Sequence, residues 1–294
     1  MKIRLVPLMA CLFCLAPIHA QTAGAPLSAE TVIKRIIAAT GATPPSDTVD
    51  TIKAGDPNTP VTGIATTFLD TYEVLQKAVA DGKNLIITHE PTFYNHRDDR
   101  SILGNDPVQA QKLAYIQEHH LVVWRFHDTW HMRKPDGILE GVIQQLGWRA
   151  YQSSTNPHVF TLPSTTVAQL ATTLQRKTGS RIIRVVGNAD MPVTQVALLP
   201  GASGLARQVA MLEREDVQVL VAGEASEWET VEYARDASAQ GRHKALILLG
   251  HEISEEPGME LCAQWLKTVL PGIPVEFIKA KEPFLSPASL AARP

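Results

Sequence analysis

The sequence predicts an α/β fold of two related halves, with mixed, mainly parallel sheets and a functional site in the crevice between the halves. Short apolar runs typical of buried strands alternate with stretches of helical periodicity. Ligand-type polar residues follow four of these runs, at the sheet edge where sites assemble in α/β proteins. Among 294 residues, 45% are hydrophobic, which is enough for a sizeable core, and the net charge of −3 gives no electrostatic footprint for nucleic acid.

The first twenty residues have the pattern of a secretory signal peptide. Lys2 and Arg4 precede an apolar stretch, and Ala20 offers a small residue for cleavage. We therefore expect a protein that is exported to the periplasm or secreted, with residues 21–27 as a linker. A lipoprotein signal through Cys11 is the alternative.

One cysteine, Cys262, is expected in the mature chain, because Cys11 and Cys14 leave with the signal. No internal disulfide can then form, so a large core or a metal must stabilise the exported protein. No membrane span is expected after residue 20.

Residues 28–148 are expected to form the first α/β half. Strands at 61–68 and 85–88 flank a helix at 71–80, and this β-α-β unit predicts a parallel pair with a right-handed crossover. Residues 43–60 are interpreted as a surface loop with at most a short strand. The other predicted elements of this half are helices at 28–40, 106–120 and 137–146 and a strand at 121–126.

Residues 149–187 are expected to be a small intervening segment, residues 188–285 the second half and residues 286–294 a tail. The intervening segment has predicted strands at 159–162 and 182–186 and a helix at 165–179. The second half has predicted strands at 193–199, 217–222, 245–249 and 275–278 and helices at 205–215, 228–240 and 259–269.

The candidate site residues follow the predicted strands. His89 and Glu90 come directly after the apolar run at 85–88, and Pro91 stops the strand there. A solvated turn is the competing interpretation. Glu224 follows the strand at 217–222 and is a candidate general base or water-orienting residue, although such a glutamate is more often a solvated charge.

His251 and Glu255 are four residues apart, so they share one face if the turn after the strand becomes helical. A helix-capping carboxylate near a surface histidine is the alternative. His127, Asp128 and His131 offer three possible ligands, of which one or two are expected to bind. The remaining histidines of the mature chain are interpreted as surface or packing residues: His96, His119, His120, His158 and His243.

This mixture of imidazoles and carboxylates is too rich for one four-coordinate structural zinc, which usually recruits cysteine. It suits two divalent ions that share a bridging carboxylate and a bridging water. Zinc, manganese and iron all accept such ligands. The loop at 200–204 could offer N–H groups to an anion, but a tight turn is favoured.

Several motifs together resemble the NGG-interacting-factor-like dinuclear metal-centre family, whose members are often labelled GTP cyclohydrolase 1 type 2 homologues. The resemblance covers residues 28–285 and follows the family's order. It implies two related α/β halves, a two-metal site between them and a homo-oligomer, often a hexameric ring. The matching stretches are residues 61–65, 85–93, 222–227, 250–255, 275–278 and 283–284.

The chain departs from the family pattern at two pairs of positions. The family usually has two histidines before the proline, where this chain has His89 and Glu90, and it has an aspartate four residues after a histidine, where this chain has His131 after His127. Relative to the family, this chain thus gains a carboxylate at Glu90 and an imidazole at His131. Asp128 could supply the second carboxylate instead. A signal peptide is a further departure that weakens the cyclohydrolase label, because a periplasmic protein meets little GTP.

The leading hypothesis is a metal-dependent hydrolase of an unknown small molecule. The ligands are expected to be His89, Glu90, His131, His251 and Glu255, with His127 or Asp128 bound directly or hydrogen-bonded to a ligand. A metal-binding protein or ring-shaped scaffold without turnover is the rival, and a protein-interaction module is the third hypothesis.

Overall fold

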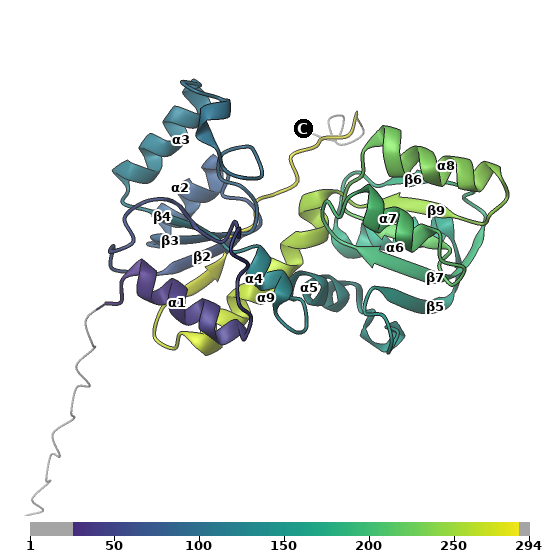
Figure 1. Cartoon of the computed structure of the whole chain (residues 1–294), viewed down its shortest axis with the longest axis horizontal. Coiled ribbons are helices and arrows are strands. Elements are labelled where there is room, and N and C mark those ends of the chain that lie inside the picture. The colour runs from purple at the N-terminus through teal and green to yellow at the C-terminus, as the bar shows by residue number, and fades with distance from the viewer. Residues whose placement is uncertain (1–25, 288–294) are drawn as a thin grey trace, which may run out of the picture.

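The computed structural model describes residues 26–287, which form two α/β lobes, each built on a five-stranded sheet (Figure 1). The predicted signal peptide lies outside the described residues, as do residues 21–25 and 288–294. The described part contains no helix with the length and hydropathy needed to cross a membrane.

The first sheet has the strand order β1-β4-β3-β2-β10. Strands β4, β3, β2 and β10 are parallel, and β1 pairs antiparallel with β4 at the edge. Helices α2 (Tyr72–Ala80) and α3 (Pro107–Glu118) cover one face, and α1 (Ala29–Thr40) and α9 (His251–Val269) cover the other, because alternate strand residues point to opposite faces. The strands are β1 (Ile52–Ala54), β2 (Ile64–Thr67), β3 (Leu85–Thr88), β4 (Val122–Arg125) and β10 (Val275–Phe277).

The second sheet has the order β5-β7-β8-β9-β6, with parallel strands in the centre and antiparallel strands at both edges. Helices α5 (Gly137–Leu146) and α6 (Val167–Thr178) pack on one face, and α7 (Leu205–Leu212) and α8 (Glu232–Ala239) on the other. The strands are β5 (Val159–Thr166), β6 (Arg184–Val186), β7 (Pro192–Leu199), β8 (Val219–Ala222) and β9 (Ala245–Leu248).

The helices begin and end at residues that suit those positions. Asp136 caps α5 by accepting hydrogen bonds from two backbone N–H groups, and Gly147 ends it in the left-handed conformation. The helices are α1 (Ala29–Thr40), α2 (Tyr72–Ala80), α3 (Pro107–Glu118), α4 (Asp128–Met132), α5 (Gly137–Leu146), α6 (Val167–Thr178), α7 (Leu205–Leu212), α8 (Glu232–Ala239) and α9 (His251–Val269).

The predicted fold class, α/β with mixed sheets in two halves, is confirmed, but the chain is divided differently from the prediction. The final strand, β10, lies in the first sheet next to β2, so residues 188–285 do not form one half. The intervening segment supplies the two antiparallel edge strands of the second sheet, β5 and β6. Hydrophobic patterns predict strands but not the sheet that each strand joins.

Helix α9 starts at His251 rather than at residue 259 as expected. Pro257 inside the helix removes one backbone hydrogen bond, and burial of the helix against both lobes outweighs this cost. Its contact with α5 is close: a Cβ on Gly258 would lie 2.5 Å from the Cα of Ile138. Helices α4, α5 and α9 thus lie between the lobes (Figure 1).

Candidate metal centre

His89 is buried at the exit of β3, with one ring nitrogen in a hydrogen bond and the other without one. Its Nδ1 lies 3.1 Å from the carbonyl oxygen of Phe126 and donates to it, since a carbonyl can only accept. Its Nε2 is buried without a hydrogen-bond partner. Burial, with the nearby rings of His127 and His131, holds the pKa of His89 well below its ordinary value. A neutral imidazole therefore presents a free lone pair inside the protein.

Glu90 turns its two oxygens in different directions. Oε2 accepts a hydrogen bond of 3.1 Å from Nη2 of Arg125, which is fully buried. Oε1 lies 3.5 Å from Nε2 of His251 and 3.7 Å from Nε2 of His127. Burial opposes ionisation, but these neighbours lower the pKa of Glu90 overall. The carboxylate is thus anchored on one side and shared between two histidines on the other.

A buried carboxylate that the sequence analysis missed, Asp50, fixes the turn into α4. It accepts hydrogen bonds from the backbone N–H groups of His127, Asp128 and Thr129 at 2.7, 2.9 and 2.8 Å. These groups begin a helix that has no cap from its own N-cap side chain. The expected strand exit is therefore a short helix, which places His127 and His131 one turn apart.

Asp128 orients His127 rather than facing the cluster. Its Oδ1 lies 2.8 Å from Nδ1 of His127, and its Oδ2 accepts from the Thr48 hydroxyl and from the N–H of Val49. Both oxygens are engaged, which leaves Nε2 of His127 free to face Glu90. A carboxylate that fixes the far nitrogen of an imidazole is a common support of metal-binding histidines.

Asp136 plays the same part for His131. Its Oδ2 lies 3.0 Å from Nδ1 of His131, while its Oδ1 caps α5 through the N–H groups of Ile138 and Leu139. Burial lowers the pKa of His131, but the hydrogen bond and charge of Asp136 outweigh it and raise the pKa overall.

His251 and Glu255 lie on one face of α9, as the conditional prediction required. His251 Nε2 is 3.0 Å from Glu255 Oε2, which in turn is 3.5 Å from Nε2 of His89. Burial opposes protonation of His251, but Glu224, Glu255 and Glu90 raise its pKa to about 12. Glu224 contacts Nδ1 of His251 at 3.6 Å and stands at the outer edge of the cluster.

The loop that the sequence analysis weighed as an anion site instead supports Glu255. The N–H of Gly201 donates to the Ser254 hydroxyl at 2.9 Å. Gly201 has φ +66°, and a Cβ there would overlap Oε1 of Glu255. Residues 200–204 form a bend at Gly201 and irregular backbone that lead into α7.

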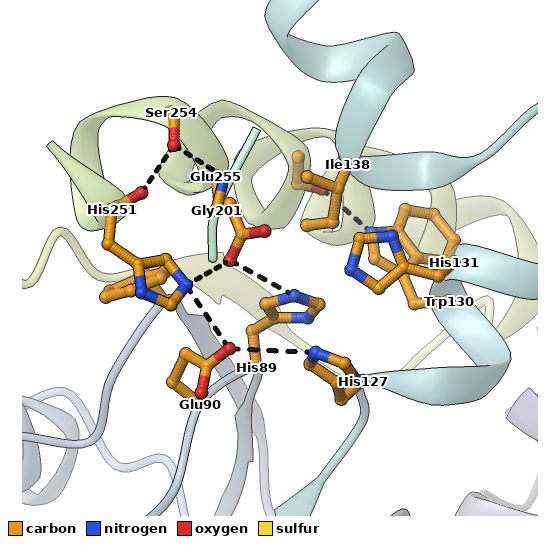
Figure 2. Close-up of polar contacts among 12 residues, drawn as sticks. His89, Glu90, His127, Trp130, His131, Ile138, Gly201, His251, Ser254 and Glu255 are labelled. Carbon is orange, nitrogen blue, oxygen red and sulfur yellow. Dashed lines mark hydrogen bonds and ion pairs between the residues drawn. The ribbon is translucent and has the colours of Figure 1, made fainter. Parts of the chain in front are cut away.

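These residues converge around His89 (Figure 2). Two groups in the described residues bring three potential ligand atoms within 4.8 Å of one another: His89 with His127 and His131, and His89 with Glu90 and Glu255. The buried unpartnered Nε2 and the mixed donor set fit a divalent metal. The imidazoles thus come from the turn after β3, from α4 with its N-cap residue, and from the first residue of α9.

The family of the chain follows from a match to a family model. Residues 49–283 match the model of Duf34/NIF3 (NGG1p interacting factor 3). The chain belongs to this family. No curated protein matches the chain.

Solved structures similar to this NIF3 family member share its fold. A Bacillus cereus protein related to NIF3 has a TM-score of 0.72 and 13% identity, covering 90% of this chain and 100% of its own. A Staphylococcus aureus hypothetical protein has a TM-score of 0.67 and 17% identity, covering 89% and 99%. Reduced HcgD from Methanocaldococcus jannaschii has a TM-score of 0.62 and 15% identity, covering 87% and 98%.

The cluster of this NIF3 protein opens into a cleft of about 950 Å³ between the lobes. The cleft is lined by residues from both lobes, among them two histidines interpreted from sequence as surface or packing residues, His96 and His158. Lining the cleft is compatible with that interpretation, because His96 is exposed and His158 packs against the chain through its hydrogen bond to the carbonyl oxygen of Leu198.

Three residues that hold the candidate ligands in place were not predicted from the sequence. For one of them, Arg125, the sequence pattern does indicate the role. Arg125 interrupts an apolar strand, and a charge there indicates a buried partner, here Glu90. Asp136, in a Pro-Asp-Gly stretch, was a recognisable helix cap but not a recognisable partner of His131. Asp50 lies in the expected loop, and nothing in its sequence surroundings indicates its role.

Proposed function

We propose that this protein is a metal-dependent hydrolase that uses two divalent cations held by His89, Glu90, His131, His251 and Glu255, with His127 completing the set. The observation that carries the metal site is the buried Nε2 of His89, which has no hydrogen-bond partner. His89 is also the residue common to both three-residue groups. A buried polar atom without a partner is costly unless a ligand satisfies it.

When bound, the two ions supply a water of lowered pKa and polarise the bond to be cleaved. The chain's own residues prepare this chemistry. Phe126, Asp128 and Asp136 each accept from the Nδ1 of one histidine and so present the Nε2 atoms of His89, His127 and His131 inward.

Glu90 would serve as a carboxylate ligand that faces histidines on two sides of the cluster. Arg125 holds its Oε2, and its Oε1 faces histidines of both lobes, His127 and His251. Glu224 contacts the opposite nitrogen of His251, which fits a residue that orients this imidazole better than a base acting inside the cluster. The general-base role considered for Glu224 is therefore not part of the proposal.

Elemental analysis of the purified protein tests metal binding. We expect about two divalent ions per chain, and His251→Ala should lower metal content and melting temperature together, because the bound metal stabilises the fold. Full metal content in His251→Ala would contradict the site. Turnover is tested with a panel of esters, phosphate esters and nucleotides. If the protein binds its full complement of metal but hydrolyses none of these compounds, the rival hypothesis of a metal-binding scaffold without turnover would be favoured.

The ligand at the α4 turn is tested by two separate replacements. His131→Ala should lose metal outright, whereas Asp128→Asn should bind metal only about 10- to 100-fold more weakly, because Asp128 orients His127 without binding metal itself. Full metal retention in both variants would mean that neither residue contributes to binding.

Export with cleavage near Ala20 and assembly into a hexamer stay predictions of the sequence. N-terminal sequencing of protein recovered from the periplasm tests the first. Light scattering of the purified protein tests the second.

A further inference from the structure

The cleft that holds the histidine cluster also carries an arginine, Arg207, with a side-chain hydrogen-bond partner. Arg207 lies in the first turn of α7, and its Nη2 is 3.0 Å from Nε2 of His158. His158 in turn lies with its Nδ1 3.0 Å from the carbonyl oxygen of Leu198. Nδ1 must donate to that carbonyl, so Nε2 is the acceptor for the guanidinium. Arg207 is thus positioned by a neutral imidazole.

This anchor leaves the positive charge of Arg207 uncompensated. Within the described residues no carboxylate lies at ion-pair distance from Arg207, whereas Arg149 of the same cleft pairs with Glu140. The carboxylates Asp128 and Asp136 are engaged with histidines. An arginine held by a neutral partner keeps both its charge and its remaining N–H donors, which match the geometry of a phosphate or carboxylate.

Arg207 is also close to the proposed metal ligands. Arg207 and His158 line a small side pocket together with His131 and Asp136, and all four residues also line the large cleft. The hydroxyl of Ser203, another residue of the cleft wall, is buried without a hydrogen-bond partner in the described part of the chain. One small molecule can therefore contact the cluster and Arg207 at the same time.

We propose that Arg207, positioned by His158, binds an oxyanion of the substrate, so that the substrate of this cleft is a small molecule carrying a phosphate or carboxylate group. The inference rests on the proposed function for the reaction itself, which the histidine cluster would perform on another part of the same molecule. Arg207 selects the substrate, and His158 is a positioning residue.

Calorimetric titration of the full chain with inorganic phosphate, and separately with succinate, tests this proposal. Arg207→Gln should weaken binding of at least one anion by about tenfold or more, as expected for a lost charge-assisted contact. The anion affinity of Arg207→Lys should lie between those of the wild type and Arg207→Gln, because lysine keeps the positive charge but lacks the paired N–H donors of the guanidinium. The matched control is Arg235→Gln, which removes one positive charge from an exposed arginine of α8 paired with Glu232.

The titrations are repeated after chelation, because phosphate can also bind metal directly. Unchanged anion affinity in Arg207→Gln, an equal loss in Arg235→Gln, or no binding of either anion to the wild type would overturn the proposal. Phosphate binding without succinate binding identifies a phosphoryl group, and the reverse identifies a carboxylate. A wild-type protein without metal would defeat the proposed function, yet the titration of chelated protein would still decide the role of Arg207.

His158 is tested by two replacements with the same readout. His158→Gln can offer an amide oxygen to Arg207 and should keep most of the anion affinity, whereas His158→Leu offers no acceptor and should lower it. Equal affinities in the two variants would remove His158 from the proposal.

Discussion

One oxygen of Asp136 lies 3.0 Å from Nδ1 of His131, while its other oxygen accepts from the first backbone N–H groups of α5. A single carboxylate therefore starts a helix and orients a proposed metal ligand. The two roles can be separated, because asparagine caps helices about as well as aspartate but carries no charge.

Asp136→Asn should lower metal affinity by roughly 10- to 100-fold, the usual cost of losing such a carboxylate partner, with little change in stability after chelation. Asp136→Ala should lower metal affinity in the same way and should also lower the free energy of unfolding by about 1 kcal/mol, because alanine cannot cap α5. Metal retained against a competing chelator and urea unfolding of the chelated protein measure the two effects. Equal metal affinity in the wild type and Asp136→Asn would show that the contact is irrelevant to binding.

Arg125 should be essential for stability. Its replacement by methionine leaves the partly buried carboxylate of Glu90 without its cation, and breaking a buried pair in this way costs about 3–5 kcal/mol. Arg125 also donates to the carbonyl oxygen of His89, so the turn that carries both residues should loosen. Urea unfolding measures the change, and Arg235→Met on the exposed face of α8 should have almost no effect. If Arg125→Met lowers the free energy of unfolding no more than Arg235→Met does, water must replace the guanidinium beside Glu90.

Gly201→Ala should displace Glu255 and so lower metal content. The added methyl group would overlap the Glu255 carboxylate, and the φ of +66° adds backbone strain of about 1–2 kcal/mol. Gly179→Ala is the matched control, because Gly179 has φ +72° and no atom within 4 Å of the place that the methyl group would take. Both variants should lose similar backbone stability, and only Gly201→Ala should lose metal. Equal metal content would show that the loop moves aside.

Stability should fall on the acid side partly because of His158. Burial, and the charge of Arg207 after it, lower the pKa of His158 below its ordinary value of 6.5 in the folded protein. Below about pH 6.5 the unfolded chain then binds a proton that the folded chain does not, so the free energy of unfolding decreases as pH falls. The slope contributed by one such group is at most about 1.4 kcal/mol per pH unit. Urea unfolding between pH 7 and 5 should show a smaller slope in His158→Gln, and equal slopes would contradict the assignment.

The strands and most helices follow from local patterns that the sequence states directly. The run at 85–88 is a buried strand, and its exit carries His89 and Glu90 as predicted. Helix α5 has the predicted bounds, because Asp136 and Gly147 are strong end signals. Convergence of the strand exits also followed from the general rule for parallel sheets.

The remaining parts depend on contacts between distant residues, which periodicity does not encode. Asp50 meets the α4 turn at His127, which lies 77 residues further along the chain. The early start of α9 is a tertiary effect, since burial against α5 outweighs the proline at 257. The role of Asp128 likewise needed the structure, because Thr48 and Val49 engage the oxygen that could otherwise bind metal.

The return of the last strand, β10, to the edge of the first sheet has a consequence for the order of folding. Its neighbour β2 comes more than two hundred residues earlier, with a register that pairs Val275 with Ile64. Helix α9, which supplies part of the first lobe's core, also comes from the end of the chain. The first lobe therefore cannot be completed until the second has been synthesised, and contacts this far apart form slowly. Separate expression of residues 28–148 should yield an unstable fragment, which carries His89, His127 and His131 but lacks α9 and with it His251 and Glu255.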